Sequence, residues 1–398
     1  MRFLGVRVDL EKAQQLKRAL VIKEENLLQQ IKIETGIDVQ LMAARSVAKV
    51  FDKLKLPYER TAKSNAPSFT KNFIINHEHP IVRMIAEARE TNKAHTTFID
   101  TIIKHEHKGR IHADINQIRS DQGGTVTGRF SYSNPNLQQL PARNKELGPM
   151  IRSIFIPEEK HRWGSFDYSQ QEPRLVAHYA ALHKFPSVND VIDSYENDTS
   201  TDFHQVVADM AKIPRSQAKV INLGLFYGMG KAKLQAELGV SKEKAAELFE
   251  TYHAKVPFVK QLTNSASNRA QERGQIRTLL GRLCRFHLWE PNQFGMHKAL
   301  PHEDALQEHG PGIRRAYTYK ALNKLIQGSA ADMTKKAMLD LHKEGIIAHV
   351  QIHDELCVSV KDEKQAKQIK EIMENSVSLE VPNKVDYEFG ANWGEING

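Results

Sequence analysis

The sequence predicts a mixed α+β fold, in which long helical segments flank short antiparallel strands. From Asp9 to about Gly36, apolar residues recur every three to four positions with charged residues between them, which is the pattern of an amphipathic helix. Asp9 suits the N-cap of this helix and Gly36 suits its end. The stretch AHVQIHDELCVSV, residues 348–360, is instead apolar and rich in β-branched residues, as strands are. Helix and strand signals in separate parts of the chain favour an α+β arrangement.

The remaining elements follow in order along the chain. Two more helical regions, at 39–54 and 79–104, make the first hundred residues mostly helical and basic. The composition changes near Lys108, where glycines, β-branched residues and Asn-Pro indicate strands and turns and mark a subdomain boundary. The later segments are predicted as a strand leading into a helix at 161–182, helices over 202–273, a polar loop at 287–312, helices at 313–344 and 363–376, and the closing segment VDYEFGANWGE.

Length and composition limit the class of protein. With 398 residues the chain has room for two or three domain-sized units. Lys and Arg outnumber Asp and Glu by 56 to 48, and the formal charge of +8 weakly favours a polyanionic partner. Cys284 and Cys357 lie too far apart in sequence for a C-x-x-C metal site. No segment approaches the roughly 18 apolar residues that span a bilayer, so we expect a cytoplasmic protein with no membrane partner.

The stretch at 348–360 raises a question about its central carboxylates. As a single strand, Val350–Val360 would place Asp354 among apolar side chains on one face, at a desolvation cost of several kcal/mol. A hairpin with its tip at His353-Asp354-Glu355 fits better, because the apolar run is far longer than an average strand of about 5 to 6 residues. Such a tip keeps the carboxylates near solvent and free to bind a cation. An aspartate in an ordinary tight turn remains the alternative for this segment alone.

A second aspartate has a similar setting. In SFDYSQQEPRL, Asp167 lies at the end of an apolar, strand-like piece just before a helix. Two aspartates at strand ends could converge across one sheet. A pair of carboxylates, completed by carbonyl and water oxygens, suits Mg²⁺, and two such ions about 3.5 to 4 Å apart can assist a phosphoryl transfer.

A basic helix is predicted between the two aspartates, in IPRSQAKVINLGLFYGMG. Arg215, Lys219, Leu223 and Tyr227 follow one another at four-residue spacing and therefore share one helical face. A guanidinium and an ammonium one turn apart can hold a triphosphate, and a tyrosine farther along can stack near a base. The alternative is an ordinary solvated charged edge of a helix.

Taken in this order, the three segments resemble the family A DNA polymerases, the group typified by bacterial DNA polymerase I and several phage replicases. DYSQQEPRL is similar to motif A of that family, RSQAKVINLGLFYG to motif B and HDE to motif C. GRFSYSNPNLQQLP is similar to the segment that grips the primer-template, and ALNKLIQGSAADM to the helix that meets the template. The resemblance covers almost the whole chain and implies a DNA-templated DNA polymerase, in the host cytoplasm if a phage encodes it.

The resemblance implies a right-hand polymerase with an antiparallel-sheet palm and mostly helical thumb and fingers. Residues 1–107 would form the thumb, 108–200 the first part of the palm, 201–312 the fingers and 313–398 the second part of the palm. Relatives commonly carry a proofreading 3′–5′ exonuclease ahead of the polymerase, whereas only the thumb region precedes Thr127-Gly128-Arg129 here. We therefore expect no exonuclease domain in this chain, with that activity supplied by a separate polypeptide or removed.

The resemblance also implies roles for individual residues. Asp167 and Asp354, with the backbone carbonyl of Tyr168, would bind two Mg²⁺ ions, for which Mn²⁺ could substitute. The catalytic group would be Asp167, Asp354, Lys219 as the proton donor to pyrophosphate, and Glu355 as a support beside the pair. The dNTP would contact His204, Arg215, Lys219, Leu223, Tyr227, Gln170 and Glu172, the last of which would exclude a ribose 2′-hydroxyl. The primer-template would contact Arg129, Asn136, Gln138, Arg152, Lys320, Asn323, Gln327 and His353.

One position departs from the family pattern, and two other functions stay open. Leu223 stands where the family usually carries Phe or Tyr beside the sugar, so we expect poor use of dideoxynucleotides. The expected partners of a monomeric chain are primer-template DNA, dNTPs, and a separate exonuclease or replisome proteins. An RNA-templated or lesion-bypass polymerase remains possible on these motifs. A non-catalytic nucleic-acid-binding relative is the other alternative, against which the intact Asp167 and Asp354 argue.

Overall fold

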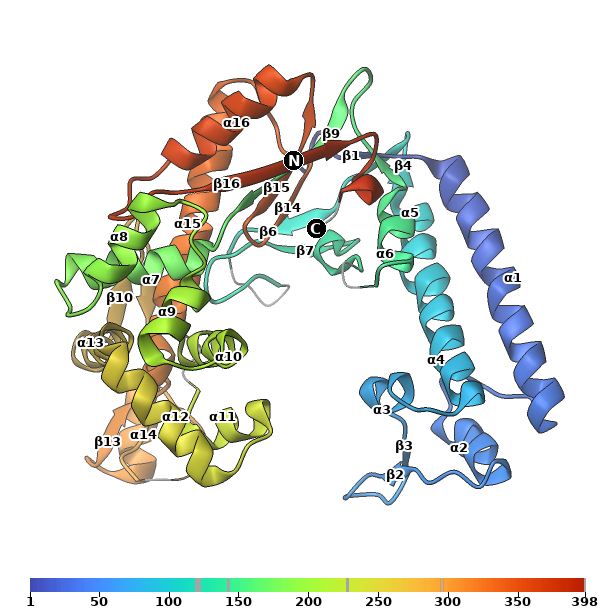
Figure 1. The fold of residues 1–398 in the computed structure, drawn as a ribbon, viewed down its shortest axis with the longest axis horizontal. Coiled ribbons are helices and arrows are strands. Elements are labelled where there is room, and N and C mark those ends of the chain that lie inside the picture. Colours follow the sequence, from blue (N-terminus) through green and yellow to red (C-terminus); the bar gives the residue numbers. More distant parts are fainter. Residues whose placement is uncertain (119–122, 142–143, 227–228, 294, 296, 397–398) are drawn as a thin grey trace. The chain divides into compact units, whose positions relative to one another are not determined.

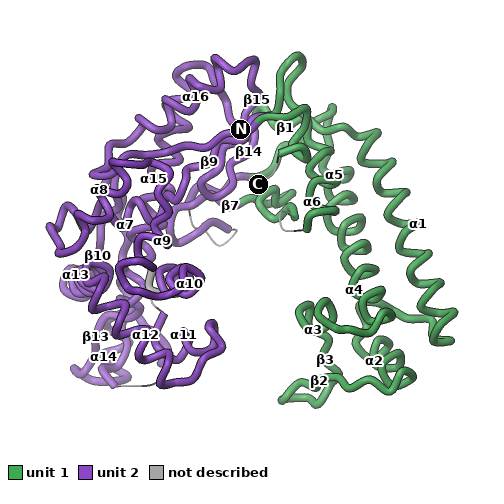
Figure 2. Tube along the Cα trace, in the orientation of Figure 1, with its two compact units in different colours: residues 1–114, 132–163, 389–398 green, residues 115–131, 164–388 purple. Residues whose placement is uncertain are grey.

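The computed structural model describes residues 1–398 except 119–122, 142–143, 227–228, 294, 296 and 397–398. The chain divides into two compact units, which Figure 2 shows in different colours. Unit 1 comprises Met1–Asp114, Tyr132–Trp163 and Phe389–Gly398, and unit 2 comprises Ile115–Ser131 and Gly164–Glu388. Each unit is therefore assembled from segments that are separated in the sequence.

Helix α1 (Leu10–Thr35) in unit 1 confirms the first predicted helix and both of its ends. The carboxylate of Asp9 accepts a hydrogen bond from the amide of Lys12 at 2.9 Å, which satisfies one of the free donors of the first turn. Gly36 ends the helix with a φ of 71°, a conformation that glycine adopts without steric penalty. Helix α2 (Ala44–Lys53) is shorter than the predicted segment 39–54.

The predicted helix at 79–104 is present as a continuous run with an irregular centre. It consists of α4 (Pro80–Lys93), a π-helical turn at Ala94–Ile99 and α5 (Asp100–His105). In the π-helical turn, the ring of His95 bonds to Glu24 of α1, with 2.5 Å between Nε2 and Oε2. The extra residue of a π turn interrupts the 3.6-residue period, so the sequence pattern did not reveal it.

The core of the helical part of unit 1 is a cluster of buried apolar side chains. Ile31, Val47, Phe51, Val82 and Ile85 are fully buried in one cluster. The smaller elements around it are β2 (Glu59–Arg60), β3 (Pro67–Ser68) and α3 (Lys71–Ile75).

Unit 1 also contains a small antiparallel sheet in the order β4-β5-β1-β8. Its strands are β1 (Val6–Val8), β4 (Glu106–His107), β5 (Arg110–Ile111) and β8 (Phe155–Ile156). Helix α6 (Leu147–Arg152) precedes β8, and a 3₁₀ turn at Trp393–Glu395 packs on α6. The buried ring of Trp393 stacks on that of Trp163, with 5.4 Å between the centroids.

The main sheet of unit 2 has the order β14-β15-β9-β16 and carries the predicted site (Figure 1). Its strands are β9 (Arg162–Tyr168), β14 (Val350–Ile352), β15 (Glu355–Val360) and β16 (Val385–Gly390). Three helices accompany it, namely α7 (Gln171–Leu182), α15 (Ala321–Lys343) and α16 (Glu363–Asn375). Helix α15 packs against both α7 and α16, and α16 lies against β15.

The helices predicted over 202–273 are also confirmed. They are α9 (Phe203–Ala211), α10 (Arg215–Phe226), α11 (Lys231–Leu238), α12 (Lys242–Lys255) and α13 (Pro257–Arg273). Helix α8 (Asn189–Asn197) precedes them, and the hairpin β10 (Gln275–Arg277) with β11 (Leu283–Arg285) follows. The predicted turn region before them holds β6 (Asp114–Asn116), β7 (Ser131–Ser133) and a 3₁₀ turn at Leu137–Gln139.

Two predictions for the segment 287–344 are wrong. The helix expected from Ile313 begins only at Ala321, because Ile313–Arg315 forms strand β13. This strand pairs with β12 (Trp289–Pro291), and helix α14 (His302–His309) lies between them in sequence. The region predicted as a polar loop is therefore folded over its described residues. Pairing between strands more than twenty residues apart leaves no local pattern in either strand.

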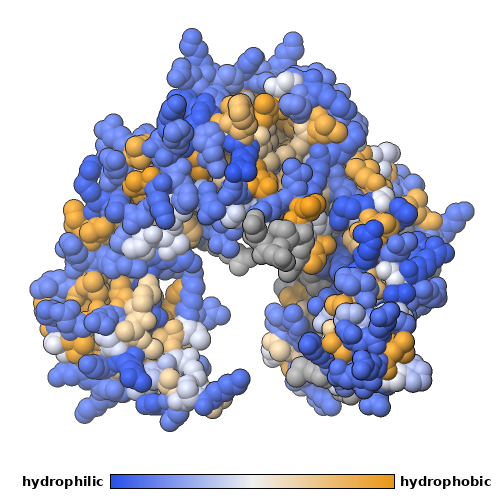
Figure 3. All heavy atoms as spheres, turned by 180° about the vertical axis from the view of Figure 1, so that it is seen from behind, coloured by the Kyte–Doolittle hydropathy of each residue, from blue (hydrophilic) through white to orange (hydrophobic). Residues whose placement is uncertain are grey.

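Polar side chains predominate on the face shown in Figure 3, and the hydrophobic residues there occur in small groups. Across the described residues, every helix is too short or too polar to cross a bilayer.

Candidate active site

The HDE segment forms the predicted hairpin. Ile352 of β14 pairs with Glu355 of β15, which leaves His353 and Asp354 as a two-residue turn. His353 takes a φ of 54°, the positive value that two-residue hairpin turns require. Glu355 is the first residue of β15, so it belongs to the strand and not to the tip as predicted. The turn leaves Asp354 half-buried and His353 exposed.

The two predicted aspartates meet at neighbouring strands. Asp167 lies near the end of β9, which is adjacent to β15 in the sheet. The amide of Tyr168 approaches the carbonyl oxygen of Asp354 at 3.4 Å, which joins the end of β9 to the hairpin turn. Burial, and then the charges of Asp354, Glu355 and Asp386, raise the pKa of Asp167. Because the Asp167 side chain reaches the surface, solvent screens part of this repulsion.

Burial also raises the pKa of Asp354, and the nearby guanidinium of Arg129 opposes that rise. The raised pKa values mean that the ionised forms of both carboxylates are destabilised by burial and by nearby negative charge. A divalent cation bound between them would neutralise that charge and stabilise the ionised forms. The available donors are oxygens: the two carboxylates and the backbone carbonyl of Tyr168. This donor set fits Mg²⁺, which prefers oxygen ligands and keeps several waters. Within the described residues, no cluster of three or more His, Cys, Asp or Glu side chains could hold a metal.

Glu355 and Tyr168, which lie next to the two aspartates in sequence, form side-chain hydrogen bonds within the protein. The hydroxyl of Ser165 donates to the carboxylate of Glu355, which also accepts from the thiol of Cys357 at 3.4 Å. The hydroxyl of Tyr168 donates to the carbonyl of Met373 at 2.6 Å, so its side chain points into the core and only its backbone can serve the site. Glu355 is therefore held in place beside the pair.

The repulsion at this site predicts a stability effect. Asp167→Asn is expected to raise the melting temperature at neutral pH when divalent ions are chelated. The pKa of Asp167 in the folded state lies above 3.8, its ordinary value in the unfolded chain. The ionised side chain therefore destabilises the fold increasingly as the pH rises from the unfolded-state pKa to the folded-state pKa. The gain should shrink as the pH falls and vanish only below about pH 3, where the carboxyl is largely protonated in the unfolded chain as well as in the folded one. Melting curves in EDTA at both pH values measure it, and a variant less stable than the parent at neutral pH would contradict the arrangement.

Arg129 lies close enough to Asp354 for its positive charge to act on that carboxylate. Its guanidinium pairs with Glu172 on α7, with 2.5 Å between Nη2 and Oε1. The hydroxyl of Thr125 donates to the carbonyl of Arg129 at 2.9 Å and shapes the loop that carries it. The residue predicted to exclude ribose and one predicted to touch DNA are thus joined directly.

Arg282, which the sequence patterns did not single out, anchors this loop. Its guanidinium donates to the carbonyls of Thr127 at 2.7 Å and Gly328 at 3.0 Å, and it pairs with buried Asp332 at 3.1 Å. Gly128 has a φ of 82°, and a Cβ there would lie 2.6 Å from Cζ of Arg282. The only local signal is that the five N–H donors of an arginine need partners once its stem is packed. Arg282 therefore joins β11, α15 and the loop before Arg129.

The basic face of α10 is present, and its first cation is already paired. Pro214 directly precedes the helix, and Arg215 forms an ion pair with Asp202 at 2.5 Å. Lys219 is exposed one turn later and Leu223 is half-buried after it. Tyr227, the last member of the predicted stripe, lies outside the described residues.

His204 is buried and held in one tautomer. The hydroxyl of Tyr252 donates to Oδ1 of Asn222, which leaves the Nδ2 of that amide to donate to Nδ1 of His204 at 3.0 Å. Burial lowers the pKa of His204. The charge of Asp202 opposes this shift, and the charges of Arg215 and Lys219 add to it. A neutral ring whose Nδ1 accepts must carry its proton on Nε2.

Gln170 is engaged in holding the chain. Its amide nitrogen donates to the carbonyl of Thr201 and its amide oxygen accepts from the amide of Phe203, both at 2.8 Å. A nucleotide contact by this side chain stays a prediction.

The predicted DNA contacts fall in both units. In unit 1, Asn136 caps the 3₁₀ turn through a bond to the amide of Gln138 at 3.1 Å, and Arg152 lies over the ring of Trp393 at 4.9 Å. In unit 2, Lys320 is exposed at the start of α15, and Asn323 and Gln327 are half-buried along its next two turns. Lys320, Asn323 and Gln327 therefore share one helical face.

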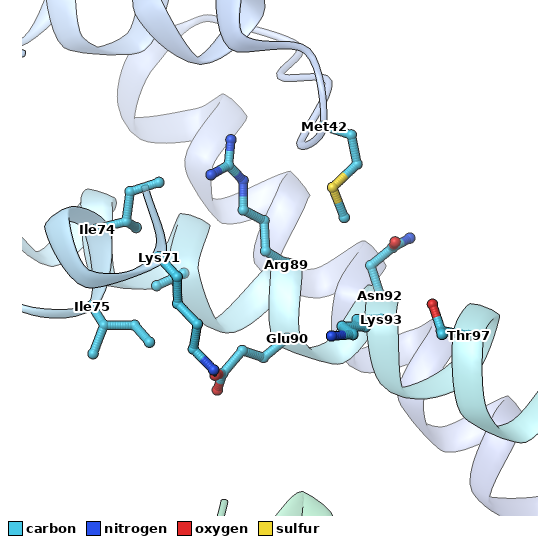
Figure 4. Close-up of a pocket in the computed structure, with 10 residues that line it drawn as sticks. Met42, Lys71, Ile74, Ile75, Arg89, Glu90, Asn92, Lys93 and Thr97 are labelled. Carbon is cyan, nitrogen blue, oxygen red and sulfur yellow. The ribbon is translucent and has the colours of Figure 1, made fainter. Parts of the chain in front are cut away.

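A cavity in unit 1 is a weaker candidate for the chemistry. Figure 4 shows it between α3 and α4, with a volume of about 350 Å³. The ammonium of Lys71 pairs with Glu90 at 3.1 Å, and the guanidinium of Arg89 donates to the carbonyls of Leu41 and Phe69. These charges are neutralised or hydrogen-bonded within the protein, and neither predicted aspartate lies in unit 1.

Known proteins resemble the chain over its full extent. The sequence model of DNA polymerase family A matches residues 10–395. A DNA-directed DNA polymerase of Pseudomonas phage M6 is 34% identical over 449 residues, which cover 100% of this chain and 64% of that protein. DNA polymerase I of Geobacillus stearothermophilus is 32% identical over 411 residues, which cover 99% of this chain and 44% of that protein. The chain thus spans less than two thirds of the length of these curated relatives.

Among solved structures, the POL domain of Pol1 from M. smegmatis, in complex with DNA primer-template and dNTP, superimposes with a TM-score of 0.75. It is 26% identical, and the match covers 98% of this chain and 68% of that one. This likeness confirms the predicted α+β class with an antiparallel sheet. Together with the match over residues 10–395, it establishes that the chain belongs to DNA polymerase family A.

Proposed function

We propose that the chain is a DNA-templated DNA polymerase, which extends a primer 3′-hydroxyl with deoxynucleoside triphosphates by two-metal-ion phosphoryl transfer. The observation that carries the proposal is the convergence of Asp167 and Asp354 on neighbouring strands, beside the backbone of Tyr168. Divalent ions bound there would lower the pKa of the primer hydroxyl and neutralise charge on the triphosphate. Membership of family A supports this reaction class.

The nucleotide would be held by α9 and α10. Arg215 and Lys219 would bind the triphosphate oxygens, so Arg215 must exchange Asp202 for phosphate when the nucleotide arrives. The Nε2–H of neutral His204 would add a directed hydrogen bond without adding charge. Lys219 would then protonate the leaving pyrophosphate.

The sugar and the primer-template would be read without reference to sequence. Glu172, fixed by Arg129, would occupy the space that a ribose 2′-hydroxyl needs. Arg129 and Gln327 could test minor-groove acceptors, which all correct pairs share. We further propose that residues 1–107 act as a thumb, 108–200 and 313–398 as a palm and 201–312 as fingers. The basic segment 1–107 would bind the backbone phosphates of the DNA, a contact that weakens as the salt concentration rises.

A primer-extension assay tests the proposal. A labelled primer on a matched DNA template should be extended in Mg²⁺, should stop at its original length in EDTA and should be extended again when Mg²⁺ or Mn²⁺ is restored. An RNA template and a template with a lesion, assayed in parallel, measure the two alternative polymerase activities. Tight DNA binding without extension in either ion would instead identify a non-catalytic relative.

Leu223 predicts a distinctive use of nucleotide analogues. The parent enzyme should incorporate dideoxynucleotides poorly, because a branched aliphatic offers neither a ring face nor a hydroxyl beside the sugar. Leu223→Tyr is expected to raise chain termination in a sequencing-type ladder, while extension with ordinary dNTPs continues. A Leu223→Tyr enzyme that terminates no more readily than the parent would refute this role, and Leu223→Met provides an aliphatic control of similar volume.

A further inference from the structure

A series of buried hydrogen bonds joins three helices of unit 2 and ends at His204. The hydroxyl of Tyr252 on α12 donates to Oδ1 of Asn222 on α10. Nδ2 of the same amide donates to Nδ1 of His204 on α9 at 3.0 Å. Tyr252 and Asn222 are fully buried, and only 8% of His204 is exposed. Each polar group in the series therefore depends on its protein partner, because solvent does not replace a missing bond there.

The series has a fixed direction, from donor to acceptor at each step. Burial raises the pKa of Tyr252, so its hydroxyl stays protonated and able to donate. An amide whose oxygen accepts from that hydroxyl presents its nitrogen, which can only donate, to the next partner. His204 must accept this bond at Nδ1, and its ring proton is thereby assigned to Nε2.

His204 lies beside a cation for which contact with the triphosphate is proposed. Its backbone amide donates to Oδ1 of Asp202 at 2.9 Å, and Oδ2 of Asp202 pairs with Arg215 at 2.5 Å. Asn222 follows Arg215 by seven residues and therefore lies on the same side of α10. Among the residues that the structure describes, none forms a hydrogen bond with Nε2 of His204, so its proton is available to a ligand.

We propose that Asn222 and Tyr252 are positioning residues for nucleotide binding, which hold the ring of His204 in the tautomer whose Nε2–H can donate to a triphosphate oxygen. Neither residue would touch the nucleotide. A ring with its proton on Nδ1 would instead present the lone pair of Nε2 to the anion, and repulsion would replace the hydrogen bond. The inference rests on the proposed function, since it assumes that His204 meets the triphosphate, and it adds two residues that had no role in the predicted site.

Nitrogen NMR of the full chain labelled with ¹⁵N-histidine, without DNA or nucleotide, tests the tautomer directly. The spectrum of His204→Gln identifies the two ring signals of His204, which in the parent should be those of an unprotonated Nδ1 and a protonated Nε2. Asn222→Asp replaces the amide donor by a carboxylate and should place a proton on Nδ1. Tyr252→Phe removes the hydroxyl that orients the amide, so the Nδ1 signal should shift toward the protonated form. A parent ring protonated at Nδ1, or an Nδ1 signal that Tyr252→Phe leaves unchanged, would overturn the inference.

Nucleotide affinity tests the consequence of the tautomer. Calorimetry measures the Kd of the matched dNTP for the full chain bound to a primer-template whose primer is terminated, so that Mg²⁺ can be present without turnover. Tyr252→Phe should weaken dNTP binding by about 2- to 10-fold, the equivalent of one hydrogen bond, and leave primer-template binding unchanged. Tyr179→Phe is the matched control, because it removes a hydroxyl that bonds to Ser329 at 2.7 Å from α7 of the same unit. It should change neither the His204 signals nor the dNTP affinity.

The His204→Gln background separates positioning from support of the fold. Glutamine offers an amide donor near the place of Nε2 and has no tautomer to be set, so adding Tyr252→Phe should leave dNTP affinity unchanged. A loss as large as the one that Tyr252→Phe causes in the parent would overturn the inference, because the hydroxyl would then act on the fold alone. Extension of an unterminated primer by the parent is measured alongside. If extension fails while Tyr252→Phe changes both the tautomer and the dNTP affinity, the proposed function is refuted and the positioning role stands.

Discussion

Replacing Asp354 with asparagine is expected to reduce primer extension at least about 10³-fold. The substitution keeps the size of the side chain but removes one of the two carboxylates that would hold the divalent ions. Metal ions supply several kcal/mol of charge stabilisation in phosphoryl transfer, and about 4 kcal/mol corresponds to a factor of 10³ in rate. Single-turnover extension at saturating dNTP measures the chemical step directly.

Asp386→Asn is the matched control for this loss. Asp386 lies on β16 of the same sheet, raises the pKa of Asp167 by its charge and is exposed to solvent. Removing it lowers the local negative charge without removing a proposed ligand, so extension should remain near that of the parent. Primer-template binding by Asp354→Asn should be unchanged or tighter, because one negative charge near the phosphates is gone. An Asp354→Asn enzyme that extends primers normally would refute the metal assignment.

Local signals in the sequence predicted the elements that carry the site. The ends of α1 depend on Asp9 and Gly36, each of which acts within one turn of itself. The hairpin at His353-Asp354 follows from an apolar run too long for one strand, interrupted by residues that are costly to bury. The approach of Asp167 to Asp354 could be proposed because both end strand-like segments, but the order of strands in the sheet came only from the structure.

Contacts between distant residues could not be predicted in the same way. Arg282 donates to a carbonyl 155 positions earlier, and nothing in its neighbourhood of the sequence indicates that partner. The ribbon of β12 and β13 was mistaken for a loop and a helix start, since short strands gain their stability from each other and not from their own composition. His204 was placed at the site by motif alone, whereas its burial and its bond to Asn222 fix its tautomer.

Arg129 shows how the two kinds of information combine. The motif assigned it to the primer-template and assigned Glu172 to the sugar, as separate roles. Their ion pair in unit 2 would make the two predicted roles interdependent, because a change at either residue leaves a half-buried charge without its partner. Substitutions at Arg129 should therefore alter ribonucleotide exclusion as well as DNA affinity.

Trp393→Ala is expected to destabilise unit 1 by about 3–5 kcal/mol, the range for truncating a buried large aromatic. Trp393 is fully buried, stacks on Trp163 at 5.4 Å and meets the edge of Phe155 at the same centroid distance. The guanidinium of Arg152 lies 4.9 Å from the Trp393 ring, so the truncation also removes a cation–π contact. Trp393→Phe retains a ring and should cost less.

Hydrogen exchange measures which parts of the chain lose stability in Trp393→Ala. Amides of α1 and α6 in unit 1 should lose protection in Trp393→Ala, whereas those of α15 in unit 2 should keep it, because the two units have separate cores. Strand β9 begins beside Trp163 and reaches Asp167 four residues later, so loosening its start would also move a proposed metal ligand. Uniform loss of protection in both units would show that they unfold as one cooperative body. A loss confined to α1 and α6 would agree with the prediction.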